Sequence, residues 1–168
     1  MALHEVDVKT LEFNPFTKIS REWMLVTAGT EGHLNTMTAS WGALGEFWGR
    51  ETVTCYIRAS RYTKEFLDAN DLFTVSFFDE TQRKALNLCG SVSGRDCDKV
   101  AQAGLTPMMV DGAPAFEEAA MVLVCRKVYV GNMPKEDFID SEADGRWYAD
   151  GDYHTMYIGT IEKALASD

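Results

Sequence analysis

The sequence has few basic residues for its number of acidic ones. Lys and Arg total 16 against 26 Asp and Glu, which gives a formal net charge of −10. Nucleic acid and anionic membrane surfaces are both bound through clustered cations, so neither is an expected partner. No run approaches the ~20 apolar residues of a membrane span, and the first residues lack the pattern of a signal peptide. We therefore expect a cytoplasmic protein.

The sequence also lacks the residue spacings of a disulfide framework or a metal site. Its four cysteines form no C-x-x-C pair, and its three histidines are far apart in sequence. A chain of 168 residues hides roughly 68–70% of its unfolded surface and needs no such support. We expect reduced, mostly buried thiols and no metal. No repeat or linker interrupts the chain, which predicts a single domain over residues 1–168.

What the sequence does contain is a series of short strand patterns. They predict strands at 22–27, 34–41, 51–58, 72–78, 119–130 and 153–161, the first two forming a hairpin. Val53, Cys55 and Ile57 share one face of the third. Without βαβ alternation or a G-x-G-x-x-G sequence, the pattern favours a mostly antiparallel β-barrel with short peripheral helices over a Rossmann domain.

The segments between these strands show the spacing of short helices and residues that commonly begin or end a helix. Short helices are predicted at 16–21, 63–69, 81–88 and 96–103. Gly90 would end the third helix, and Asp96 would cap the fourth, which Gly104 ends. Gly42, Gly45 and Gly49 are interpreted as loop glycines. The polar, acidic stretch 133–152 is expected to be an exposed loop.

A basic corner stands out at residues 58–64, where a predicted strand ends and a helix begins. It reads Arg58-Ala59-Ser60-Arg61-Tyr62-Thr63-Lys64. Helix N-termini attract anions, arginine grips phosphate with two parallel hydrogen bonds, and hydroxyls add further donors. The sequence therefore indicates a phosphate site. The plainer interpretation is a helix capped by Ser60 or Thr63 and flanked by solvated arginines.

Three further stretches carry weaker signals. In Asn35-Thr36-Met37-Thr38-Ala39-Ser40-Trp41, a strand places Thr36, Thr38 and Ser40 on one face, where hydroxyls could bond a flat polar ring. An ordinary half-exposed strand explains the same residues. The Gly/Ser loop at 90–96 offers polar backbone to a ligand, although a plain turn explains it equally well. His154 opens the last strand, and a structural role competes with a catalytic one.

Taken together, these segments resemble the flavin reductase-like family with the FMN-binding split-barrel fold, in particular its flavoredoxin-like branch. The similarity runs from about Lys18 to Lys163. The carrying stretches, in the family's order, are 35–41, 58–63, 93–96 with Asp98-Lys99, and 154–159. The resemblance implies an antiparallel Greek-key split barrel, a homodimer, and FMN near the subunit interface.

The resemblance also implies roles for individual residues. The stretch from Asn35 through Thr36, Met37, Thr38, Ala39 and Ser40 to Trp41 would line the isoalloxazine ring. Arg58, Ser60, Arg61 and Thr63 would hold the phosphate, with Tyr62 also at the cofactor. Ser91 and its neighbours would close the pocket, and His154 would lie near the reactive side of the ring as a candidate catalytic residue. No family motif matches residues 133–152.

The expected function is that of an FMN-binding oxidoreductase. NAD(P)H is the candidate electron donor, and the acceptor is a small molecule or a redox protein. Two alternatives stay open at the level of the sequence. One is a flavoredoxin-type electron carrier reduced by a protein partner, for which the acidic surface would suit a basic partner. The other is a non-catalytic flavin-binding protein.

Overall fold

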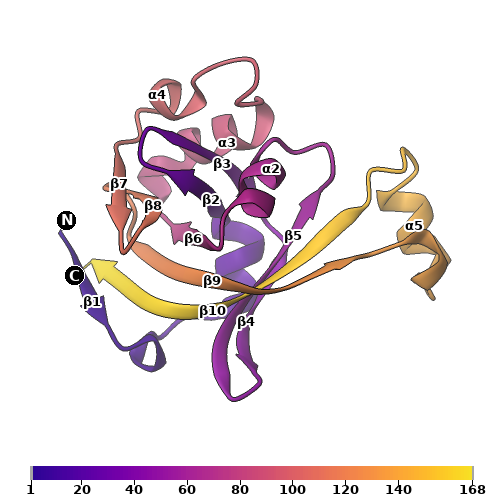
Figure 1. Ribbon diagram of the computed structural model, residues 1–168, viewed down its shortest axis with the longest axis horizontal. Helices are drawn as coiled ribbons and strands as arrows, with labels where there is room; N and C mark the ends of the chain where they lie inside the picture. The colour runs from indigo at the N-terminus through magenta and orange to yellow at the C-terminus, as the bar shows by residue number, and fades with distance from the viewer. Residues whose placement is uncertain (1, 168) are drawn as a thin grey trace.

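The computed structural model of the protein describes residues 2–167, which form mainly β-strands joined by short helices (Figure 1). The strands are β1 (Leu3–Val6), β2 (Met24–Thr30), β3 (His33–Ala39), β4 (Gly42–Phe47), β5 (Arg50–Arg58), β6 (Leu72–Phe77), β7 (Pro107–Val110), β8 (Ala113–Phe116), β9 (Met121–Asn132) and β10 (His154–Ser167). The helices are α1 (Pro15–Thr17), α2 (Thr63–Ala69), α3 (Arg83–Ser91), α4 (Lys99–Ala103) and α5 (Ser141–Trp147), with the short turns η1 (Val8–Thr10), η2 (Lys18–Glu22), η3 (Glu80–Gln82) and η4 (Lys135–Asp137). The mostly β prediction is confirmed.

All of the strand pairings are antiparallel. One eight-stranded sheet has the order β3-β2-β6-β9-β10-β5-β4, with β1 added on β10, while β7 and β8 form a separate hairpin. The predicted hairpin at 22–41 is confirmed by the pairing of β2 with β3. β9 and β10 extend as a long arm away from the rest of the molecule and carry α5 at its end (Figure 1).

Hydrophobic side chains are buried on both faces of the β2–β6–β9 part of the sheet. On the inner face, Val26, Val75 and Leu123 pack with residues of β5 and α2. On the other face, Leu25 and Val122 pack beneath α3 and the β7–β8 hairpin. The predicted alternation in β5 is confirmed, because Val53, Cys55 and Ile57 are all fully buried. Hydrophobic packing on both faces therefore holds this part of the sheet in place.

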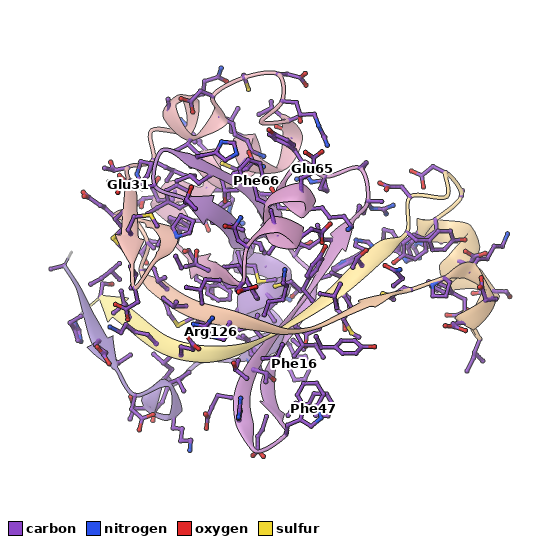
Figure 2. The ribbon with its side chains drawn as sticks, in the orientation of Figure 1. Phe16, Glu31, Phe47, Glu65, Phe66 and Arg126 are labelled. Carbon is purple, nitrogen blue, oxygen red and sulfur yellow. The ribbon has the colours of Figure 1, made fainter. Side chains whose placement is uncertain are left out.

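Two of the glycines predicted to lie in a loop belong instead to strand β4, while Gly49 lies in the turn that follows it, as predicted. Gly42 and Gly45 pair with Cys55 and Thr52 of β5. The prediction was wrong because β4 is a largely exposed edge strand, and its side chains do not alternate between buried and exposed positions as those of a half-buried strand would. Its tip carries Phe47 stacked on Trp48 with ring centroids 3.9 Å apart, and Figure 2 shows Phe47 at that end of the hairpin. The short strands β1, β7 and β8 were also not predicted.

The helices follow the predictions with two corrections. Helix α2 has the predicted bounds. Helix α3 continues through Gly90 instead of ending before it. The glycine allows α3 to lie close to β3, since a Cβ at this position would be 3.2 Å from the Cβ of Thr38. The cap of α4 is Asp98 rather than Asp96, and its side chain accepts from the Ala101 N–H at 3.0 Å. Gly104 ends that helix in the left-handed conformation, as predicted.

The stretch 133–152, expected to be a loop, contains η4 and helix α5. Asp140 caps α5 by accepting hydrogen bonds from the backbone N–H groups of Glu142 and Ala143 at 3.0 and 3.3 Å. This helix escaped prediction because it is polar on most of its surface and has no apolar stripe. The segment instead folds back against the ends of β5 and β10.

Other features of residues 2–167 bear on function. No helix among them is long and apolar enough to cross a membrane. These residues contain no group of three or more His, Cys, Asp or Glu side chains that could hold a metal ion. The cysteines are free thiols; three are buried, and Cys97 is half-buried.

Candidate functional site

A pocket of about 290 Å³ lies where the ends of β3 and β5 meet the start of β10 and the end of α3. The predicted residues from 37 to 41 line it, as do Arg58, Arg61 and His154. Two of the lining residues, Tyr56 and Trp147, were not predicted. The full lining is Met37, Thr38, Ala39, Ser40, Trp41, Tyr56, Arg58, Arg61, Gly90, Trp147 and His154.

Strand β3 supplies one wall of the pocket, but its first predicted residues face elsewhere. Asn35 is buried and its Nδ2 donates to Thr63 Oγ1 at 2.7 Å. Thr36 is also buried, with its Oγ1 2.8 Å from that of Thr27. Thr38 does reach the pocket, although its hydroxyl donates to the carbonyl oxygen of Leu86 at 2.5 Å. The structure therefore places Asn35, Thr36 and Thr63 in the framework behind the pocket.

The two arginines of the basic corner are held by main-chain carbonyls. Arg58 Nη1 donates to the Asp152 oxygen and Nη2 to the Trp147 oxygen, both at 2.9 Å. Arg61 Nη1 donates to the Gly90 oxygen at 3.0 Å. Burial lowers the pKa of Arg61 while Asp152 raises it, and an arginine remains charged at neutral pH. Two cations therefore line the pocket.

The neighbouring residues of the corner make contacts of their own. Ser60 is hydrogen-bonded to the carboxylate of Asp152 through both its N–H and its hydroxyl. The Arg95 guanidinium lies over the ring of Tyr62 at 4.6 Å, outside the pocket lining. The residue at the N-cap of α2 is Tyr62, which makes no side-chain capping bond. The interpretation of Ser60 or Thr63 as the cap is therefore wrong.

His154, the first residue of β10, lines the pocket. Its Nδ1 lies 2.7 Å from the hydroxyl of Tyr148, and its ring centroid is 5.3 Å from that of Trp41. Burial, and then the charge of Arg58, lower the pKa of His154 to about 4, while Asp152 opposes the shift. The imidazole is therefore neutral at pH 7 and offers one donor and one acceptor nitrogen.

Ser91 lies just outside this pocket. Its hydroxyl donates to the Leu88 oxygen at 3.2 Å, and it lines an adjoining hollow of about 310 Å³ together with Trp23 and Asn87. The two hollows share Thr38, Ser40 and Gly90. Ser91 thus borders the site without facing its centre.

The residues missed at the sequence level are aromatic. Trp147, at the end of α5, meets Trp41 edge-on with ring centroids 5.0 Å apart. Tyr148 packs against His154 and stacks on Tyr153, at 5.4 and 4.8 Å. The signal available was the adjacent Trp147-Tyr148 pair within an otherwise acidic segment. Tyr56 could have been found too, because it shares a strand face with Arg58.

A second, more apolar hollow of about 490 Å³ adjoins the pocket and shares Ser40, Trp41 and Tyr56 with it. It continues toward Phe16 and Leu44. Flat ligands are commonly held between apolar and aromatic walls, with a few polar groups to fix their orientation. This arrangement can hold a flat ring with an anionic tail directed at the arginines.

Comparison with known proteins gives a consistent picture. The flavin reductase like domain model matches residues 16–168. A search of curated proteins finds no match. Among solved structures, a flavoredoxin from Methanosarcina acetivorans has a TM-score of 0.70 at 22% identity, covering 88% of this chain and 69% of that one.

Two other solved structures share the fold. An FMN-binding domain of a flavin reductases-like enzyme from Shewanella baltica has a TM-score of 0.69 at 18% identity, covering 98% of this chain and 76% of that one. An NADH:FAD oxidoreductase from Streptomyces globisporus has a TM-score of 0.66 at 19% identity, covering 87% and 75%. The predicted split-barrel fold is therefore confirmed.

Proposed function

Because the chain belongs to the family defined by the flavin reductase like domain, we propose that it is an FMN-binding oxidoreductase. It passes electrons from NAD(P)H through bound FMN to an acceptor. The observation that carries the proposal is the pocket at the ends of β3 and β5, which brings Trp41, His154 and two arginines together from distant parts of the chain. The binding roles of these residues are part of the proposal.

The residues present fit a flavin. Trp41, Tyr56 and Trp147 offer ring-sized apolar walls, and Arg58 and Arg61 offer donors to a phosphate at one end. Ligand pockets commonly enclose ~300–1,000 Å³. The pocket and its adjoining hollow, of about 290 and 490 Å³, together fall within that range. No metal is needed for this chemistry.

A bound flavin would supply the hydride and electron transfer, and the side chains of this chain would bind and orient it. Arg58 and Arg61 hold the anionic tail. Trp41 and Trp147 cover the ring and keep water from it. His154, held neutral, presents Nε2 as a hydrogen-bond donor when the Tyr148 hydroxyl donates to Nδ1.

One observation favours the alternative of an electron carrier reduced by a protein partner. The net charge is −10, and the segment that borders the pocket is rich in exposed carboxylates, among them Glu142 and Asp150. A negative surface beside a redox site steers a basic partner toward it. In this version a redox protein partner reduces the bound flavin, and nicotinamide has no direct role.

We also propose that the protein is a homodimer. The arm formed by β9 and β10 carries Val128, Tyr129 and Val130, whose side chains are 40, 45 and 45% exposed. Three consecutive exposed apolar residues on a projecting strand are typical of a surface covered by a partner. A second copy of the chain would cover this strand.

The test is an absorbance spectrum of the purified protein with added FMN, taken before and after anaerobic addition of NADH and then NADPH. Flavin bands that shift on binding and bleach with either nucleotide support the reductase and identify its donor. Bands that bleach only with an added redox protein support the carrier. A protein that binds no FMN contradicts both functions.

A further inference from the structure

The basic corner is bonded to a carboxylate from the chain itself. Asp152 Oδ1 accepts from the backbone N–H of Ser60 at 3.0 Å, and Asp152 Oδ2 accepts from the Ser60 hydroxyl at 2.6 Å. One carboxylate thus takes both donors of a residue predicted to hold the phosphate. It binds them as a phosphate would, through two oxygens of an anionic group.

The same segment is anchored by Arg58. Its guanidinium donates to the main-chain oxygens of Trp147 and Asp152, and the carboxylate of Asp150 lies 3.8 Å away. These bonds involve the backbone of the segment, so they survive when the Asp152 side chain alone rotates away from Ser60. The corner therefore has a fixed part, at Arg58, and an exchangeable part, at Ser60.

We propose that Asp152 is a built-in competitor of the flavin phosphate. The inference rests on the proposed function and concerns the ligand preference of that same site. A phosphate reaching Ser60 must displace the carboxylate, since two anions cannot share these donors without strong repulsion. Riboflavin has no phosphate and leaves the Asp152–Ser60 contact intact. Asp152 therefore weakens the binding of FMN without weakening that of riboflavin, and so reduces the ratio of the two affinities.

The contact is largely exposed to solvent, which sets the size of the effect. Charge-assisted hydrogen bonds are stronger than neutral ones, but solvent and salt weaken them at a surface. We expect Asp152→Ala to tighten FMN binding about tenfold at low ionic strength, from the loss of two such bonds and one repulsive charge. Riboflavin binding should change by less than about twofold.

The experiment measures dissociation constants for FMN and for riboflavin by quenching of flavin fluorescence. The matched control is Glu142→Ala, which removes one exposed carboxylate from the same segment, on α5 and outside the corner. Glu142 makes none of the hydrogen bonds to Ser60, so any effect of this variant is long-range and should fall below about twofold for both constants at physiological salt, where the Debye length is about 8 Å. In a Ser60→Ala background, Asp152→Ala should lose part of its gain, because the hydroxyl donor is removed while the backbone N–H remains.

Several outcomes overturn the inference. Unchanged or weaker FMN binding by Asp152→Ala shows that the carboxylate does not compete. An equal gain for FMN and riboflavin shows a steric barrier instead of competition between anions. If Asp152→Ala does not fold, Asp152→Asn keeps the shape and removes the charge, and a smaller gain confined to FMN is expected. Failure of the unaltered protein to bind either flavin contradicts the proposed function itself, and the inference with it.

Discussion

At the scale of single residues, the pocket depends on groups that do two things at once. Arg58 lines the pocket and also donates a hydrogen bond to the main-chain oxygen of Asp152. His154 lines the pocket and is hydrogen-bonded to Tyr148 behind it. Such shared duties mean that a substitution changes both the local structure and the chemistry of the site. Single variants of these residues should therefore be judged by binding and stability together.

The titration of His154 gives a prediction at this scale. Its pKa is lowered from 6.5 to about 4 in the folded protein, so the unfolded chain binds an extra proton between these pH values. The free energy of unfolding should fall as the pH drops through that window, by at most about 1.4 kcal/mol per pH unit from this residue. Above pH 6.5 the contribution is constant.

Denaturant unfolding of the protein and of His154→Gln between pH 4 and 7 checks this expectation. The variant has no titrating group at this position, so its free energy of unfolding should decline less steeply over the window. Arg58 and Asp152, whose charges act on His154, remain in both proteins. Parallel curves for the two proteins would show that His154 does not take up the proton on unfolding.

At the scale of elements, β10 joins the core to the site. It begins at His154 in the pocket and runs between β5 and β9. Its register with β9 shifts at Ile158/Gly159. A Cβ on Gly159 would lie 2.7 Å from two ring atoms of Phe73 and 2.9 Å from the Cβ of Cys125. The close packing of β10 against Phe73 and Cys125 therefore requires a residue without a side chain at position 159.

Gly159→Ala should therefore lower the free energy of unfolding by about 1–3 kcal/mol, the usual cost of overpacking a core. The matched control is Gly45→Ala in β4, where a Cβ would meet nothing within 4 Å. That variant should be nearly neutral or slightly stabilising, because alanine restricts the unfolded chain. Denaturant unfolding of both variants makes the comparison, and equal stabilities would refute the packing argument.

At the scale of the whole molecule, the chain separates a packed body from a projecting arm (Figure 1). The body is stabilised by two hydrophobic clusters on opposite faces of the sheet. The arm lacks this double coverage, and its β9 residues Val128, Tyr129 and Val130 remain partly exposed. Covering the arm with a second copy would remove that apolar surface from water.

The proposed homodimer predicts a sedimenting mass of twice that of the chain in analytical ultracentrifugation. Tyr129→Glu should shift the equilibrium toward the monomer, because it buries a charge in an apolar contact. Met109→Glu on β7, also at an exposed apolar residue but outside the arm, is the control and should remain dimeric. A monomeric unaltered protein, or a Tyr129→Glu variant that stays dimeric, contradicts this interface.

The sequence alone predicted the parts of the fold that depend on neighbours along the chain. The β2–β3 hairpin, the buried face of β5 and the bounds of α2 follow from periodicity and turn residues, which act over a few positions. β4 was missed because it is a largely exposed edge strand, and α5 because its segment is held by the distant Arg58; neither carries a periodic apolar pattern.

The site divides in the same way. Residue chemistry and the family resemblance were enough to single out Met37 through Trp41, the two arginines and His154. Only the tertiary structure decided that Asn35, Thr36 and Thr63 serve the framework, and that Trp147 completes the pocket. It also decided that Asp152 bonds Ser60 from 92 positions away. Such pairings arise when distant strand ends are packed together, and no local pattern in the sequence records them.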